Sequence, residues 1–279
     1  MKTASPILIL GARGKTGQRL APLLREAGQA LRLGTRSPTA PDEVAFDWAD
    51  KDGAIAAFDG VEAAYVVAPT DRTDHAEVMI PVLEQAIKAG TRRLVLLSAA
   101  SLERGGPMMG QIHDYLAHNA PEWAVLRPSW FMQNLAEPRH MVSARTLGCL
   151  YTAAGEGRVA FIDAGDIARV AAVALTSLKP LNRDLILTGP QSLTYAEVAH
   201  QLGHHLGHEV RHVSLSVPQL ARRLELQGLP SDYAQLLAGM DQAIADGPPE
   251  VVSFEVLTLT GQPPRSFADC MASDPAFAP

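Results

Sequence analysis

A glycine-rich segment near the start of the chain, Gly11-Ala12-Arg13-Gly14-Lys15-Thr16-Gly17, limits the possible folds more than any other feature. It follows a short apolar run, Pro6–Leu10, and precedes Thr16–Ala27, whose leucines recur at helical spacing. In such a strand–turn–helix, the glycines permit a tight turn, close approach of a pyrophosphate and packing of helix on strand. The helix N-terminus adds N–H donors and a positive dipole end. The segment therefore predicts a dinucleotide-binding loop.

The spacing of these glycines argues against a nucleoside triphosphatase. A P-loop, GxxxxGK[ST], has four residues between its glycines, whereas only two separate Gly11 from Gly14. The spacing here is GxxGxxG, in the strand–turn–helix context that a dinucleotide site requires.

The end of the second predicted strand, Ala30–Gly34, indicates which dinucleotide is bound. A protein that prefers NAD carries an acid there for the ribose 2′-hydroxyl, whereas this chain carries Thr35-Arg36-Ser37. The Arg36 guanidinium and the Ser37 hydroxyl suit a 2′-phosphate, and Arg13 could cover the same group from the loop. The expected cofactor is NADPH/NADP+. The alternative is that both arginines are only solvated.

Short apolar strands alternate with amphipathic helices over about the first 130 residues. The predicted buried strands after the first two are Ala63–Ala68, Arg93–Ser98 and Trp123–Arg127. Continuous apolar strands between helices predict a parallel sheet covered on both faces. The expected fold class is α/β, a doubly wound parallel Rossmann-type sheet with a small C-terminal substrate-binding cap.

The domain limits follow from where this alternation loosens. We expect an NAD(P)-binding domain over residues 1–130, to which the chain returns around 158–190. Residues 131–157 and 191–279 are expected to form the smaller cap, which completes a pocket.

Composition excludes several other classes of function. The net charge is −6, which argues against a nucleic-acid partner because a phosphate-tracking surface needs a basic excess. No apolar run approaches the roughly 18 residues that cross a membrane, and a cytoplasmic protein is expected. Cys149 and Cys270 form no metal-ligand spacing, and Gly207 separates the histidines near residue 205, so no metal is expected.

Longer stretches of the chain are similar to a known family. They include LVLLSA at 94–99, GGPMMGQIHDYL at 105–116, WAVLRPSWFMQNL at 123–135 and TGQPPRSFADC at 260–270. On these segments the chain resembles the NmrA-like branch of the atypical short-chain dehydrogenases. Within that branch it resembles the ergot-alkaloid festuclavine dehydrogenase and agroclavine reductase group, with its bacterial relatives. The resemblance covers nearly the whole chain and implies secondary metabolism, specifically alkaloid biosynthesis.

The resemblance also implies roles for individual residues. It places Asp47 and Trp48 beside the adenine, and Ala68 and Pro69 along the adenine–ribose side. It places Ser98 and Ala99 beneath the nicotinamide ribose, and Pro128 and Ser129 at the nicotinamide end. The residues that it places against the substrate are Met108, His113, Trp130, Phe131 and Asn134.

One feature of related enzymes is missing from this chain. Short-chain dehydrogenases usually protonate a carbonyl oxygen with a tyrosine that is activated by a lysine four residues later. The five tyrosines here are followed at that distance by Pro69, Asn119, Gly155, Ala199 and Leu237. A ketone reductase must neutralise a developing alkoxide, whereas hydride addition to C=N⁺ removes a charge. The sequence and the resemblance together predict an NADPH-dependent imine or iminium reductase.

Several alternatives stay open at this stage. His113 is the candidate catalytic acid, but a helix residue that only lines the pocket explains it as well. Trp130 and Phe131 suit either stacking on a flat substrate or core packing. The substrate could instead be a quinone, an enone or a cationic dye, or the protein could be a non-catalytic NADP redox sensor. A monomer or a homodimer is expected, with a small-molecule substrate as its partner.

Overall fold

The chain forms two compact units in the computed structural model, which describes residues 5–70, 72–248 and 250–278. Unit 1 consists of Met1–Pro128, Ala164–Leu187 and Phe254–Gln262. Unit 2 consists of Ser129–Asp163, Thr188–Ser253 and Pro263–Pro279. The sequence placed the first boundary at residue 130 and the return at 158–190. It did not anticipate the third stretch of unit 1, because α10 (Glu255–Thr260) is too short for a recognisable helical period.

A sheet of seven parallel strands forms the centre of unit 1, in the order β3-β2-β1-β4-β5-β6-β9. The strands are β1 (Ile7–Leu10), β2 (Leu31–Thr35), β3 (Glu43–Ala45), β4 (Ala63–Val67), β5 (Arg93–Leu97), β6 (Glu122–Pro128) and β9 (Arg183–Leu187). The order reverses between β1 and β4. In open α/β sheets, ligands bind beyond the carboxyl ends of the strands at such a reversal.

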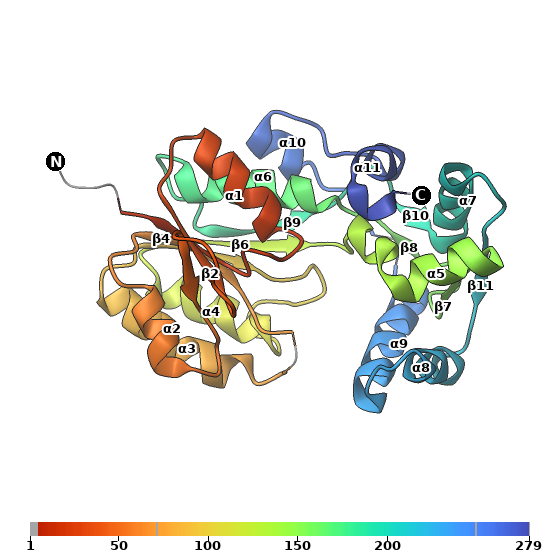
Figure 1. The fold of residues 1–279 in the computed structure, drawn as a ribbon, viewed down its shortest axis with the longest axis horizontal. Coiled ribbons are helices and arrows are strands. Elements are labelled where there is room, and N and C mark those ends of the chain that lie inside the picture. Colours follow the sequence, from red (N-terminus) through yellow and green to blue (C-terminus); the bar gives the residue numbers. More distant parts are fainter. Residues whose placement is uncertain (1–4, 71, 249, 279) are drawn as a thin grey trace. The chain divides into compact units, whose positions relative to one another are not determined.

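Helices cover both faces of this sheet (Figure 1). One face carries α1 (Gly17–Glu26), α6 (Ala164–Thr176) and α10. The other carries α2 (Lys51–Ala57), α3 (His75–Lys88) and α4 (Met109–Asn119). Leu8, Val66 and Leu96 of the strands pack with Met79 and Leu83 of α3 in a buried core. The predicted doubly wound α/β class is confirmed.

Unit 2 is a mixed assembly of helices and short strand pairs. Its elements are η1 (Met132–Ala136), α5 (Pro138–Leu147), β7 (Cys149–Thr152), β8 (Arg158–Val159), β10 (Leu193–Thr194), α7 (Tyr195–Leu206), β11 (Arg211–Ser214), α8 (Val217–Leu226), α9 (Ser231–Asp246), α11 (Phe267–Ser273) and η2 (Pro275–Phe277). β7 pairs in parallel with β11, and β8 pairs antiparallel with β10. Among the described residues of the whole chain, no helix combines the length and the apolarity needed to span a bilayer.

Candidate functional site

The glycine loop lies between β1 and α1, as the sequence predicted. Gly11 has a φ of 61°, a conformation that favours glycine, and its carbonyl accepts the Gly14 N–H at 2.8 Å. A methyl group at Gly17 would come within 2.3 Å of the Gly11 carbonyl oxygen and 2.8 Å of the Ala12 Cα. The first and third glycines therefore allow the turn and the close approach of α1 to the loop.

The N-terminus of α1 is suited to an anion. Its N-cap residue, Thr16, makes no side-chain capping bond, and the first turn holds no acidic residue. The Thr16 hydroxyl instead accepts a hydrogen bond from the buried Tyr65 hydroxyl at 3.1 Å, and burial raises the pKa of that phenol. No carboxylate in the first turn of α1 therefore neutralises the positive end of the helix dipole. This end of the helix is suited to binding a pyrophosphate.

The end of β2 presents Arg36 and Ser37 to solvent. Arg13 behaves differently, because its guanidinium donates to Glu43 at 2.8 Å and to the Thr39 hydroxyl at 2.8 Å. Glu43 also accepts the Thr39 N–H, and that bond is the main cause of its pKa being lowered to about 2. Arg13 is therefore engaged by a permanent anion, which leaves Arg36 as the better placed of the two for a phosphate.

Asp47 and Trp48, expected beside the adenine, follow β3. Asp47 is exposed and accepts the Ala49 N–H at 2.9 Å. Trp48 is buried: its Nε1–H donates to the Val67 carbonyl at 2.9 Å, and its ring meets Phe46 edge-on, with centroids 4.9 Å apart. Trp48 thus links the segment after β3 to the end of β4, and its place beside the adenine stays a prediction.

The remaining predicted cofactor residues of unit 1 gather at the same edge of the sheet. Ala68 and Pro69 follow β4, Ser98 and Ala99 follow β5, and Pro128 ends β6. The Ser98 hydroxyl is buried and has no hydrogen-bond partner among the described residues. An unpaired buried hydroxyl at this edge fits a bound polar ligand, because such a group is otherwise costly to bury. Ser129 belongs to unit 2, where its hydroxyl donates to Glu250 at 2.6 Å.

His113, the candidate acid, lies in the interior of unit 1. It is 2% exposed, its ring packs 5.7 Å from that of Trp123, and neither ring nitrogen has a described partner. Burial lowers its pKa, so the imidazole is neutral near pH 7. Trp123 is the second residue of β6, at the opposite end of that strand from the cofactor edge. The position of its neighbour Trp123, away from the cofactor edge, favours a packing role for His113, although packing does not explain the two unpartnered ring nitrogens. Met108 is also in unit 1, at the start of α4, with a φ of 55°.

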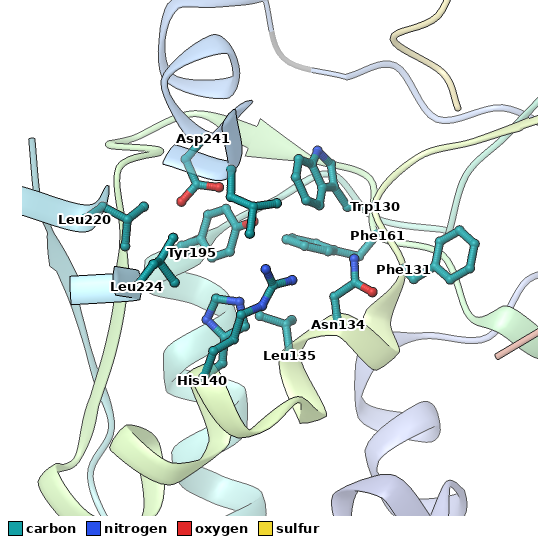
Figure 2. A pocket seen from close by; sticks show the side chains of 12 residues that line it. Trp130, Phe131, Asn134, Leu135, His140, Phe161, Tyr195, Leu220, Leu224 and Asp241 are labelled. Carbon is teal, nitrogen blue, oxygen red and sulfur yellow. The ribbon is translucent and has the colours of Figure 1, made fainter. Parts of the chain in front are cut away.

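A pocket in unit 2 contains the other three predicted substrate residues, Trp130, Phe131 and Asn134 (Figure 2). It encloses about 450 Å³ of empty space, part of which is open to solvent. The other lining residues are Leu135, Arg139, His140, Phe161, Tyr195, Leu220, Leu224, Leu237 and Asp241. The Phe161 and Tyr195 rings meet edge-on with centroids 5.4 Å apart.

Sequence reasoning missed these nine lining residues, and Asp241 is the acidic one among them. It lies on α9 and is 9% exposed. Burial raises the pKa of its carboxyl to about 6, although the Ala153 N–H and the charge of Arg139 act in the opposite direction. The signal was present in the sequence: Ala234, Ala238 and Asp241 recur at helical spacing, which puts an acid on the buried stripe of a helix.

A second polar cluster in unit 2 surrounds Gln133. Asp163, Cys270 and Asp274 bring their ligand atoms within 4.8 Å of one another, a grouping that the sequence did not reveal. The Gln133 Nε2 lies among them and donates to Asp274 at 2.9 Å, Asp163 at 3.1 Å and the Cys270 sulfur at 3.3 Å. These hydrogen bonds link η1 to α11 and to Asp163, the residue before α6.

Comparisons with known proteins agree with the dinucleotide-binding edge. The family model described as NAD(P)H-binding matches residues 11–177. An uncharacterized oxidoreductase, YesF, of Bacillus subtilis is 39% identical over 99% of this chain and 98% of its own. Agroclavine dehydrogenase of Claviceps fusiformis is 37% identical over 96% of each chain. The fold is similar to that of NADPH-dependent quinone oxidoreductase QOR2 from Escherichia coli, with a TM-score of 0.82 and 23% sequence identity. The match covers 95% of this chain and 98% of the QOR2 chain. The chain therefore belongs to the family of NAD(P)H-binding oxidoreductases that includes the agroclavine and festuclavine dehydrogenases.

Proposed function

We propose that this protein is an NADPH-dependent reductase that transfers a hydride to the C=N bond of a small-molecule imine or iminium. One observation carries the assignment of the C=N bond. The sequence contains no tyrosine that is followed four residues later by a lysine. A carbonyl acceptor needs such an acid because negative charge develops on oxygen. A C=N⁺ acceptor needs position and a suitable cavity, because its charge is lost during the reaction.

The residues of the sheet edge have distinct tasks in this proposal. The amides of the glycine loop and of the first turn of α1 bind the pyrophosphate. Arg36 and Ser37 bind the 2′-phosphate, while Ser98 and Ala99 support the nicotinamide half. Bound NADPH supplies the hydride. The aromatic side chains of the unit 2 pocket hold a flat acceptor and keep water from it.

Turnover of defined acceptors tests the proposal. Oxidation of NADPH is followed by absorbance with a cyclic iminium, a ketone, a quinone and a cationic dye, with NADH in parallel. We expect turnover of the iminium with NADPH preferred. Turnover of the quinone or the dye alone would show that the acceptor belongs to another chemical class. Cofactor binding without any NADPH oxidation would favour a redox sensor.

The cofactor preference is tested separately by Arg36→Asp. Loss of a charge-assisted pair with the 2′-phosphate, worth about 1.5–3 kcal/mol, should weaken NADPH binding roughly 10- to 100-fold and leave NADH nearly unchanged. The measurement is cofactor affinity by titration calorimetry. Arg211→Asp, the same change at an exposed position of β11, is the matched control. Equal weakening of both cofactors would contradict the role of Arg36.

A further inference from the structure

The unit 2 pocket has an apolar wall and one acidic side chain. Leucines and aromatic rings form most of its lining, and Figure 2 shows Asp241 on the same side as Tyr195, with Leu220 and Leu224 nearby. One Asp241 oxygen, Oδ2, accepts the Ala153 N–H at 3.0 Å. No arginine, lysine or histidine among the described residues lies within ion-pair distance of this carboxylate. Asp241 is thus a nearly buried anion without a protein counter-ion.

The other titratable residues of the pocket do not act as the counter-ion of Asp241. Arg139 forms an ion pair with Glu137, with a nitrogen–oxygen distance of 2.9 Å. Its charge reaches Asp241 only at longer range. Tyr195 is neutral at physiological pH, since burial, reinforced by the charge of Asp241, raises the pKa of its phenol. In Figure 2, Asp241 lies above Tyr195 and His140 lies below it.

A buried carboxylate of this kind is costly unless something compensates its charge. Isolated buried charges are avoided in proteins, and those that persist are paired, hydrogen-bonded or functional. A ligand with a positively charged nitrogen would compensate it. The rings of Trp130, Phe161 and Tyr195 suit the same ligand, because the faces of aromatic rings attract cations and their area accommodates an apolar body.

We propose that Asp241 is the specificity-determining counter-ion of this pocket and that the pocket binds an organic cation, a protonated amine or an iminium joined to a ring system. The link to catalysis rests on the reductase function proposed above, but binding of the cation does not. Asp241 would favour a cationic acceptor and its amine product over neutral ketones and quinones. The carboxylate forms no covalent bond to the ligand and transfers no proton.

A pair of ligands with the same shape and different charge tests this inference without any turnover. Tetrahydroisoquinoline is a cation at neutral pH, whereas isochroman carries an ether oxygen in place of the nitrogen and is neutral. Both are titrated into the protein by calorimetry in the absence of cofactor. We expect the wild type to bind the amine at least about tenfold more tightly, as a charge-assisted hydrogen bond implies.

Asp241→Asn should remove that preference while leaving the affinity for isochroman nearly unchanged. The amide oxygen can still accept the Ala153 N–H, which favours an intact fold. Asp246→Asn, the same change at an exposed position of α9, should keep the preference. Equal binding of the two ligands by the wild type would overturn the inference, and so would an Asp241→Asn variant that still prefers the amine. Because nothing is reduced in this experiment, its failure is distinct from failure to oxidise NADPH.

Discussion

Replacing Gly17 by alanine is expected to abolish tight cofactor binding and to lower the free energy of unfolding by about 2 kcal/mol or more. The added methyl would lie 2.3 Å from the Gly11 carbonyl oxygen and 2.8 Å from the Ala12 Cα, and both are backbone atoms that cannot rotate away. Either α1 or the loop must shift, and the amides that we propose bind the pyrophosphate shift with them. Calorimetric titration with NADPH and urea unfolding measure the two effects.

A second helical glycine provides the control for this variant. Gly239 lies in α9, and a methyl group there would meet nothing within 4 Å. Gly239→Ala should therefore stabilise the protein by roughly 0.5–1 kcal/mol, the gain expected when alanine replaces glycine inside a helix. If Gly17→Ala instead stabilised the protein as Gly239→Ala does, the inference that α1 packs too closely on the loop to admit a methyl group would be wrong.

Asp241→Asn is expected to stabilise the protein near pH 7.5, on the order of 3 kcal/mol. The carboxyl has a pKa of about 6 in the folded protein, raised mainly by burial, compared with an ordinary value of 3.8. Between these values the folded protein holds a proton that the unfolded chain releases. The stability of the wild type therefore falls as the pH rises from about 4 to about 6. The variant does not lose stability in this way, because asparagine does not titrate.

Urea unfolding at a series of pH values measures this difference. The stability gap between Asp241→Asn and the wild type should be small near pH 4 and reach its full size above pH 7. Asp246→Asn, at an exposed position of the same helix, should show no comparable gap. A gap of the same size at every pH would mean that the amide acts through packing and not through the charge. A residue that lowers stability where the protein works is typical of a functional site.

The sequence predicted unit 1 better than unit 2 for a physical reason. The strands of a parallel sheet are buried on both faces, so Ala63–Val67 and Arg93–Leu97 appear as continuous apolar runs between helices. The glycine loop adds a backbone requirement that few other structures share. Unit 2 uses strand pairs as short as Arg158–Val159 with Leu193–Thr194, and two residues cannot establish a period.

The site residues divide in the same way. Gly11 and Gly17 were identifiable because backbone geometry restricts which residue can occupy those positions. Trp48 and His113 were harder to interpret, since a buried ring and a ring that contacts a ligand need the same apolar neighbours. As a site residue, Tyr195 was considered only for the lysine that does not follow it, while its place in the same pocket as Asp241 depends on how α7 and α9 are arranged within unit 2. Contacts between elements distant in the sequence leave no local pattern.

The interleaving of the two units has a consequence for how the protein is made. When the first 128 residues have left the ribosome, β6 still lacks its neighbouring strand β9. The sheet face that α1 covers also still lacks α6. Both elements are synthesised only after the first segment of unit 2, and α10 follows after Ser253. The nascent dinucleotide-binding unit therefore exposes apolar surface through most of its translation, and its completion waits for nearly the whole chain.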